Sequence, residues 1–448
     1  MNTALLTKYP VSGPRYTSYP TALEFGELDP ASLIQGWTSS DKQALSLYLH
    51  IPFCHSLCYY CGCNKQVTRQ RQKSETYLQY LLLEIKQRAA LFSGKPVTQI
   101  HFGGGTPTYL DDDQLSRLMA ALRLAFEVAA KAEISIEIDP RQTELPRLGH
   151  LAALGFNRLS IGVQDFDSKV QQAVNRVQDE EHIFQLVKQG RALGFSSISL
   201  DLIYGLPHQS VESFRPTMEK VLALRPDRLS LFNYAHLPEK FAAQRRIKES
   251  DLPTVNERRA IFTMAATLLV DGGYLCIGMD HFALADDELA KAQREGKLHR
   301  NFQGYTTQQE ADLLGLGVSA ISQIGHVLAQ NHKEIKDYYG AVEAGGSATD
   351  KGYALDQDDK IRGVVIKELI CHFHLHFGQI EKRFGLEFNA YFADDLRRLA
   401  EMEKDGLVRI DKDSIEVTDA GRPWIRAICM QFDRYMTAKL NRSFSRII

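Results

Sequence analysis

Four of the seven cysteines in this chain fall within one short stretch, at positions 54, 58, 61 and 63. The first three are spaced C-x3-C-x2-C. Packing does not explain such a run, because one loop cannot bury four thiols separately. The spacing brings Cys54, Cys58 and Cys61 to the same side of a tight loop, as a bound metal or metal cluster requires.

The crowding of these cysteines favours an iron–sulfur cluster over structural zinc. Zinc sites usually use two C-x2-C knuckles, or a cysteine pair with a distant histidine pair. No second knuckle follows here, whereas iron–sulfur clusters are held by crowded cysteine runs. A cubane bound by three cysteines keeps one iron open for a cofactor or substrate. Cys63 would either complete a closed, structural four-cysteine site or lie beside the substrate.

The C-x3-C-x2-C spacing resembles the signature of the radical S-adenosylmethionine (SAM) family. In that family the open iron chelates the amino and carboxylate groups of SAM. One electron from the cluster then cleaves SAM to methionine and a 5′-deoxyadenosyl radical, which abstracts hydrogen from the substrate. The resemblance therefore implies a redox-active [4Fe-4S] cluster with SAM as its partner.

Composition sets the class of protein. The chain has 448 residues, 44% of them hydrophobic and 24% charged, with a net charge of -2. These values are typical of a globular protein of two or three domains and argue against a dedicated nucleic-acid-binding protein. We expect no signal peptide and no membrane-spanning helix. An odd, clustered set of cysteines is no disulfide framework, so we expect a cytoplasmic protein.

Strand and helix patterns alternate from residue 45 to 271. Strands are expected at 45–51, 98–102, 133–138, 158–163, 197–203 and 227–232, with helices near 74–92, 112–128, 144–154, 179–193, 210–224 and 255–271. This order predicts an α/β fold of parallel βαβ units, as a barrel or an open sheet. Active sites in such folds lie at the carboxyl ends of the strands. Candidate site residues follow those ends: the glycines 103–105, Glu137, Gln164, Asp201 and Asn233.

Each candidate also has a structural interpretation. The glycine run would hold the SAM methionine group or form a tight turn. Glu137 and Asp201 would bind ribose hydroxyls or lie at helix N-termini. Arg176 would pair with the SAM carboxylate or be solvated. His50 would donate a proton or be a hydrogen-bonded core histidine.

The two ends of the chain differ from the middle. Residues 1–28 are rich in turn formers and are expected to form an arm on the surface or over the site. Residues 299–324 are irregular, and 325–358 are expected to form a helix and a loop. From 359 onward, helices followed by a two-stranded ribbon resemble a winged helix. Basic and acidic residues are nearly balanced there, which favours a structural or lid role over binding to a duplex.

Eight stretches together resemble the bacterial oxygen-independent coproporphyrinogen III oxidase family, from the arm to the final helix. They are residues 14–20 (PRYTSYP), 48–54 (YLHIPFC), 58–65 (CYYCGCNK), 103–107 (GGGTP), 137–140 (EIDP), 162–165 (GVQD), 201–207 (DLIYGLP) and 233–236 (NYAH). The resemblance implies oxidative decarboxylation of two propionates of coproporphyrinogen III to vinyl groups, giving protoporphyrinogen IX without oxygen.

The resemblance also implies an architecture. It predicts an arm at 1–28, an incomplete (β/α)6 barrel at 29–305, and a mostly helical domain with a winged-helix-like end at 306–448. The enzyme would be monomeric and take electrons from a reduced flavodoxin- or ferredoxin-type donor. Arg15 in the arm is a candidate to bind a propionate.

Site residues follow from the same resemblance. Cys54, Cys58 and Cys61 would hold the cluster and Cys63 would not. A first SAM would contact Tyr48, Gly104, Glu137, Ala235 and Ile321. A second SAM would contact Tyr60, Gly105, Thr106, Gln164, Arg176 and Asp201.

Three alternatives remain open from the sequence. A haem-binding chaperone on the same scaffold is the nearest, although such relatives typically lack the Cys63 equivalent and the arm. A winged-helix regulator with a cluster as sensor conflicts with the balanced charge and the long βα series. The third is a radical SAM enzyme acting on another substrate.

Overall fold

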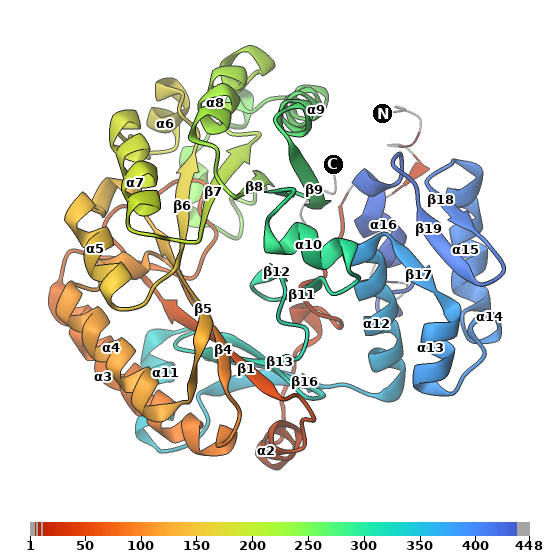
Figure 1. The fold of residues 1–448 in the computed structure, drawn as a ribbon, viewed down its shortest axis with the longest axis horizontal. Coiled ribbons are helices and arrows are strands. Elements are labelled where there is room, and N and C mark those ends of the chain that lie inside the picture. The colour runs from red at the N-terminus through yellow and green to blue at the C-terminus, as the bar shows by residue number, and fades with distance from the viewer. Residues whose placement is uncertain (1–4, 6–7, 10–11, 437–448) are drawn as a thin grey trace.

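The computed structural model describes residues 5, 8–9 and 12–436, and a twelve-stranded sheet forms its centre (Figure 1). The strands run in the order β16-β15-β14-β13-β1-β4-β5-β6-β7-β8-β10-β9. Six neighbouring strands are parallel: β1 (Ala44–Ile51), β4 (Val97–Gly104), β5 (Val128–Ile138), β6 (Arg158–Gln164), β7 (Ser197–Tyr204) and β8 (Arg228–Asn233). Each strand lies beside the next one in the chain, as consecutive βαβ units require.

Helices cover the outer face of this curved sheet (Figure 1). They are α2 (Pro30–Thr38), α3 (Arg71–Ala89), α4 (Asp112–Ala125), α5 (Leu145–Ala153), α6 (Ser168–Ala173), α7 (Glu180–Ala192), α8 (Val211–Leu224) and α9 (Val255–Asp271). Their starts are encoded locally. Asp111 and Gln114 form a capping box at α4, and Thr254 and Glu257 form one at α9.

The barrel is open, because β1 and β8 do not pair with each other. On the far side of β1 lie β13 (Ala311–Leu316), which is parallel to β1, and then the antiparallel strands β14 (Ile321–Ile324), β15 (Val327–Asn331) and β16 (Thr349–Ala354). Beside β8 lie the antiparallel strands β10 (His281–Leu284) and β9 (Tyr274–Gly278). The predicted incomplete (β/α)6 barrel is confirmed.

A smaller helical domain lies at the open side of the barrel (Figure 1). It contains α12 (Gln357–His372), α13 (Phe377–Phe384), α14 (Phe388–Tyr391), α15 (Ala393–Lys404) and α16 (Ile425–Met430) around the strands β17 (His374–His376), β18 (Val408–Ile410) and β19 (Ser414–Val417). The expected two-stranded ribbon is present, and β17 joins it as a third strand. Buried aromatic side chains such as Phe388, Phe392 and Trp424 form a core separate from that of the barrel.

The remaining helices and strands of the described residues are short. They are β2 (Phe53–Cys54), β3 (Gln66–Val67), α10 (Glu288–Arg294), β11 (His299–Asn301), β12 (Gly304–Thr306), α11 (Ile335–Glu343) and the 3-10 helices at Ala22–Glu24, Ala90–Phe92, Pro107–Tyr109, Pro140–Gln142, Ala242–Arg246, Glu249–Asp251 and Arg422–Trp424.

The predicted domain boundary at 305/306 divides the main sheet, because β13 to β16 belong to it. Residues 325–358, expected as a helix and a loop, hold the two strands β15 and β16 besides α11. We therefore propose a boundary near 355. Residues 437–448 of the predicted C-terminal domain lie outside the described part of the chain.

The N-terminal arm is docked on the helical domain. Tyr16 Oη donates to Asp433 Oδ2 at 2.9 Å, and the amide of Arg434 donates to Tyr19 Oη at 3.1 Å. Both rings join the core of that domain. The arm prediction began at residue 1, and positions 1–4, 6–7 and 10–11 lie outside the described residues.

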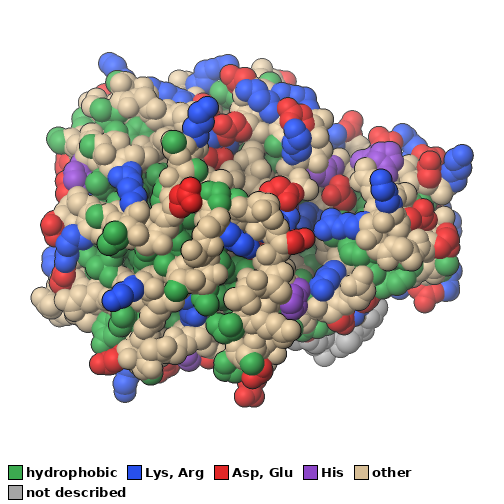
Figure 2. Space-filling model, turned by 60° about the horizontal axis from the view of Figure 1, so that its bottom comes forward, with side chains coloured by type: hydrophobic (Ala, Val, Ile, Leu, Met, Phe, Trp, Pro, Cys, Tyr) green, Lys and Arg blue, Asp and Glu red, His purple; other side chains and the backbone are tan. Residues whose placement is uncertain are grey.

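Within the described residues, no helix is both long and apolar enough to span a bilayer. Figure 2 shows Lys and Arg interspersed with Asp and Glu over one face, in keeping with the small net charge.

Candidate active site

The cysteine loop joins β2 to β3 at the carboxyl end of β1, and other strand-end segments hold it in place. The amide of Tyr59 donates to Val174 O at 3.0 Å, and Asn175 Nδ2 donates to Leu57 O at 2.8 Å. Gln244 Nε2 donates to Tyr60 O at 2.9 Å. All seven cysteines are free thiols.

Hydrogen-bond donors from three neighbouring strand ends point at the thiols. Thr106 Oγ1 donates to Cys54 Sγ at 3.5 Å. Cys58 Sγ accepts from Arg141 Nη2 at 3.4 Å and from Arg176 Nη1 at 3.5 Å. Hydrogen bonds and positive charge beside cysteine sulfurs stabilise and tune cluster-bound thiolates. The surroundings of Cys54 and Cys58 thus fit an iron–sulfur cluster.

Asp139 organises the two arginines. Its Oδ2 lies 2.6 Å from Arg141 Nη2 and 3.4 Å from Arg176 Nη1. The carboxylate follows β5 directly and caps the next turn, accepting from the amide of Arg141 at 3.1 Å. One local turn therefore supplies both the counter-ion and one of the arginines.

The thiols differ in their electrostatic setting. Burial raises the pKa of the Cys54 thiol to about 11. A hydrogen bond from Cys63 lowers the pKa of Cys61 to about 6, with help from Lys65. Within the described residues, no group of three or more His, Cys, Asp or Glu side chains is placed so that it could hold a metal ion. The loop and the donors around it fit a cluster, and its ligands stay a prediction.

A cavity of about 340 Å³ lies next to this loop, inside the barrel mouth. Its lining includes Tyr48, Gly104, Glu137 and Ile321 of the expected first SAM site, together with His50 and Cys63. Ala235 does not line it; the Ala235 carbonyl instead accepts from Gln244 Nε2 at 3.1 Å.

Glu137 and the glycine run shape one wall of the cavity. Glu137 Oε2 accepts from the amide of Gly104 at 3.2 Å, and Glu137 Oε1 lies 3.3 Å from His101 Nε2. Gly104 has a φ of +118°, and a Cβ there would lie 2.8 Å from the His50 ring. Only glycine therefore fits at 104 without displacing His50, so a ligand can approach the backbone closely.

His50 is held in one tautomer by its contacts. Its Nε2 lies 3.0 Å from the carbonyl of Asn64, which can only accept, so Nε2 carries the proton. Its Nδ1 then accepts from Tyr48 Oη at 3.1 Å. Burial lowers the pKa of His50, which favours the neutral ring. In this arrangement His50 orients Tyr48, and its expected role as a proton donor stays a prediction.

The residues expected to contact a second SAM lie around Arg176. Arg176 Nη2 donates to the carbonyl of Gly162, and a Cβ at Gly162 would lie 2.9 Å from Gln164 Nε2 and 3.1 Å from Arg176 Nη2. Tyr60 is half-buried near Arg176, while the amide of Gly105 donates to Ile51 O at 2.9 Å. Gln164 Oε1, Arg176 Nε and both amide atoms of Asn233 are buried without a hydrogen-bond partner. Unpaired buried polar atoms are costly, and a bound polar ligand would satisfy them.

Asp201 lies between the two sets. Its Oδ2 accepts from Ser160 Oγ at 3.1 Å. Burial, and then the nearby Glu137 charge, raises the pKa of Asp201 to about 6. Hydrogen bonds from Ser230 and Ser160 oppose this rise in the pKa. A carboxylate at a strand end can also accept hydrogen bonds from ligand hydroxyl groups.

Several residues of this region were not predicted. The lining includes Asn64, His101, Phe302, Gln303, Leu313 and Ser319, and Asp139 and Arg141 adjoin Cys58. Asp139 and His101 sit at ends of predicted strands and had a positional signal. Phe302 and Gln303 form the turn between β11 and β12, in a region without periodicity, so nothing local marked them.

Comparison with known proteins adds to this geometry. Residues 48–221 match the radical SAM superfamily and residues 355–424 match the HemN C-terminal domain. The chain is 58% identical over 447 residues to the oxygen-independent coproporphyrinogen III oxidase of Escherichia coli, covering 99% of this chain and 98% of that protein. The corresponding protein of Pseudomonas aeruginosa is 49% identical over 453 residues, again covering 99% and 98%. This chain belongs to the oxygen-independent coproporphyrinogen III oxidase family.

A solved structure supports the same assignment. The Escherichia coli coproporphyrinogen III oxidase, described as a radical SAM enzyme, superposes with a TM-score of 0.92 at 56% identity. The match covers 96% of this chain and 98% of that one. The predicted membership of the family is confirmed over the barrel and the helical domain together.

Proposed function

We propose that this chain is the radical SAM enzyme that decarboxylates two propionates of coproporphyrinogen III to vinyl groups, giving protoporphyrinogen IX without oxygen. The observation that carries the proposal is the set of three loop cysteines beside a cavity lined by Glu137 and His50, in a chain that matches oxidases of this name over 99% of its length. Bound in this loop, a [4Fe-4S] cluster would supply one electron for the reductive cleavage of SAM to methionine and a 5′-deoxyadenosyl radical, which would take hydrogen from the propionate β-carbon. Each propionate thereby loses carbon dioxide, one hydrogen atom and one electron.

Cys54, Cys58 and Cys61 would hold the cluster. Thr106, Arg141 and Arg176 would donate to its sulfur ligands, as they do to the thiols. Cys63 lies in the cavity lining, which supports a place on the substrate side. A role for Cys63 in proton or hydrogen transfer stays a prediction.

Two SAM molecules would occupy the two contact sets. Tyr48, Gly104, Glu137 and Ile321 line one cavity and would hold the first. The unpaired atoms of Gln164 and Arg176, with Asp201, would receive the polar groups of the second. Ala235 would contribute only through its backbone.

Electrons would come from a reduced flavodoxin- or ferredoxin-type donor. Arg246 lies 5.2 Å from the ring of Tyr59 in the cysteine loop, and exposed Arg245 and Lys248 flank it. Basic side chains beside the loop fit an acidic redox partner. Reduction rates that fall steeply with added salt, and that fall in Arg246→Glu, would support this docking face.

The enzyme would act as a monomer in the cytoplasm. Seven free thiols suit a reducing compartment. Sedimentation of the cluster-loaded protein should give a mass near 50.6 kDa.

Anaerobic turnover tests the function. The reconstituted protein receives reductant, SAM and coproporphyrinogen III, with a cell extract as the final electron acceptor. We expect vinyl product and 5′-deoxyadenosine, both lost in Cys54→Ser. SAM cleavage without decarboxylation would point to another substrate. Tight haem binding without SAM cleavage would instead favour the chaperone.

A further inference from the structure

Three arginines meet where the arm, the β11–β12 hairpin and the helical domain come together. Arg15 forms an ion pair with Asp280, and its guanidinium lies 5.5 Å from the ring of Phe232. Arg300 Nε donates to the carbonyl of Arg15 at 3.3 Å. Arg426 Nε donates to the carbonyl of Pro14 at 2.9 Å. Chain segments far apart in sequence thus bring three cations into one cluster.

Among the described residues, Arg15 and Arg300 share one facing carboxylate in this cluster. Asp280 is the carboxylate that faces it, and Arg15 and then His281 hold the pKa of Asp280 well below its usual range although burial opposes them. Burial lowers the pKa of His281, which favours the neutral ring. Burial and then Arg15 lower the pKa of Arg426 to about 9, so that side chain is still charged at pH 7.

Arg300 carries the clearest sign of a missing partner. Arg300 is 4% exposed, and its Nη1 is buried without a hydrogen-bond partner. The guanidinium lies 4.5 Å from the Tyr305 ring, which does not satisfy that N–H group. Arginine is almost never buried without an anion, because desolvating the charge is costly.

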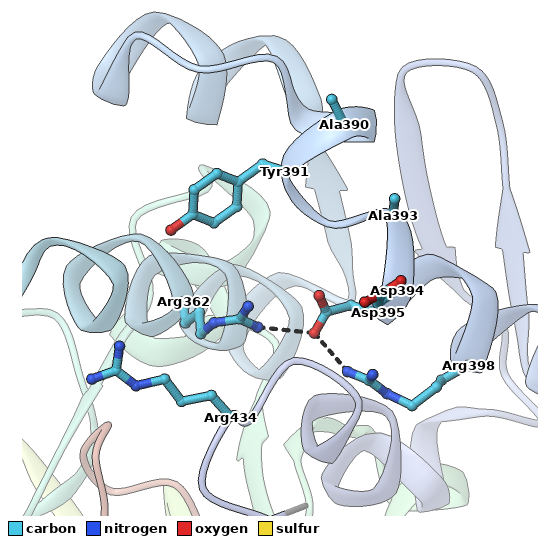
Figure 3. Close-up of a pocket in the computed structure, with 8 residues that line it drawn as sticks. All are labelled: Arg362, Ala390, Tyr391, Ala393, Asp394, Asp395, Arg398 and Arg434. Carbon is cyan, nitrogen blue, oxygen red and sulfur yellow. Dashed lines mark hydrogen bonds and ion pairs between the residues drawn. The ribbon is translucent and has the colours of Figure 1, made fainter.

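A pocket in the helical domain shows the opposite arrangement (Figure 3). This pocket, of about 360 Å³, is lined by Arg362, Arg398 and Arg434. Arg362 Nη1 and Arg398 Nη2 both donate to Asp395 Oδ1, at 2.9 and 2.8 Å. Arg434 Nη1 donates to Asp358 Oδ2 at 2.8 Å. Protein carboxylates pair these arginines, so the pocket needs no external anion.

The cluster of Arg15, Arg300 and Arg426 borders the barrel mouth. Phe232 lies near the end of β8, next to its last residue Asn233, whose amide atoms are buried without a hydrogen-bond partner. Arg300 lies in β11, and the turn that follows β11 carries Phe302 and Gln303 into the lining of the Glu137 cavity. Arg15 keeps 32% of its side-chain surface exposed, so a ligand can reach it.

We propose that Arg15 and Arg300, with Arg426 holding the arm beside them through Pro14, form a carboxylate site that binds one propionate of the porphyrinogen and so positions the macrocycle over the strand ends. This site rests on the proposed function. A guanidinium fork matches a carboxylate in geometry and charge. Because the arm supplies Arg15, docking of the arm completes the site.

Binding of a stable porphyrin to the cluster-loaded full chain tests the site. Coproporphyrin III, which has four propionates, is titrated by fluorescence against wild type, Arg300→Met and Arg398→Met. We expect at least a tenfold weaker Kd in Arg300→Met and no change in Arg398→Met, whose arginine is paired by Asp395. Deuteroporphyrin IX, with two propionates, should be less affected.

Thermal unfolding separates a ligand role from a structural one. Removing an excess buried charge should leave the Tm of ligand-free Arg300→Met unchanged or higher. If Arg300→Met does not fold, Arg300→Lys decides: weaker binding supports the site and wild-type binding overturns it. Wild-type affinity in folded Arg300→Met overturns the carboxylate site alone. A wild-type chain that neither binds coproporphyrin nor decarboxylates would also overturn the proposed function.

Discussion

Replacing Asp201 by Asn should stabilise the ligand-free protein and weaken its binding of SAM. Asp201 has a pKa of about 6 against an ordinary 3.8, because burial and Glu137 disfavour its charge. That difference corresponds to roughly 3 kcal/mol of unfavourable free energy once the side chain is ionised. Ser160 donates to the carboxylate at 3.1 Å, and Asn can still accept this hydrogen bond through its oxygen.

The sign of the pH dependence follows from the raised pKa. The folded protein holds a proton on Asp201 between pH 3.8 and about 6, where the unfolded chain has lost it. This group therefore lowers the free energy of unfolding as pH rises through that window, and the loss is complete above it. At pH 8 the Asn variant should be more stable than wild type by about 1–3 kcal/mol, and the difference should shrink as pH falls towards 4.

Urea unfolding of the cluster-free chain at pH 5 and pH 8 measures this difference. Trp37 is buried against the barrel and reports on it by fluorescence, whereas Trp424 reports on the helical domain. Asp312→Asn is the matched control, because Asp312 is buried 3.0 Å from Lys95. Breaking that pair should lower the free energy of unfolding at pH 8.

The same substitution should also weaken the binding of SAM. If Asp201 accepts from ligand hydroxyls, the cluster-loaded Asn variant should bind SAM about 10–100-fold more weakly. An Asn variant less stable than wild type at pH 8 would refute the argument from buried charge. Unchanged SAM affinity would remove Asp201 from the site.

Four further substitutions test other parts of the account. Cys58→Ser should abolish the visible absorbance and the bound iron of the reconstituted protein, whereas Cys63→Ser should keep both. Loss of iron in Cys63→Ser would show that Cys63 is a cluster ligand. Gly104→Ala places a Cβ 2.8 Å from the His50 ring, at a residue whose φ is +118°. The affinity for SAM, measured by equilibrium dialysis, should therefore fall at least tenfold. Wild-type affinity would contradict the close approach of a ligand to Gly104. The Glu84 carboxylate accepts hydrogen bonds from Gly317 N, Asn331 Nδ2 and Tyr338 Oη at 2.7–2.8 Å. Glu84→Ala leaves these buried donors unpaired and should lower the free energy of unfolding by about 3–5 kcal/mol. A loss of less than about 1 kcal/mol would contradict a stabilising role for this network.

Local patterns were sufficient to predict the parallel part of the fold. Each of the six strands is followed by its own helix, and adjacent units pair with each other, so periodicity and order determine the arrangement. The strands β13 to β16 were missed because each has only four to six residues. Their place in the sheet also depends on pairing with β1, more than 250 residues earlier in the chain, as in Leu47 with Leu314.

Some residues of the site could likewise be predicted from local sequence, and others could not. Glu137, Gln164 and Asp201 could be predicted because carboxyl ends of parallel strands converge, whatever the helices between them. Ala235 gave no signal, since a backbone contact leaves no trace in the side chain. Arg300 and Phe302 could not be placed either, because the β11–β12 hairpin takes its position from contacts with the arm and with α12.

Isotope transfer tests the central claim most directly. Coproporphyrinogen III carrying deuterium on the propionate β-carbons is turned over anaerobically with SAM, and the 5′-deoxyadenosine is analysed by mass spectrometry. The account predicts one deuterium in 5′-deoxyadenosine for each vinyl group formed, and neither product in Cys54→Ser. Vinyl product with unlabelled 5′-deoxyadenosine would contradict hydrogen abstraction from that carbon.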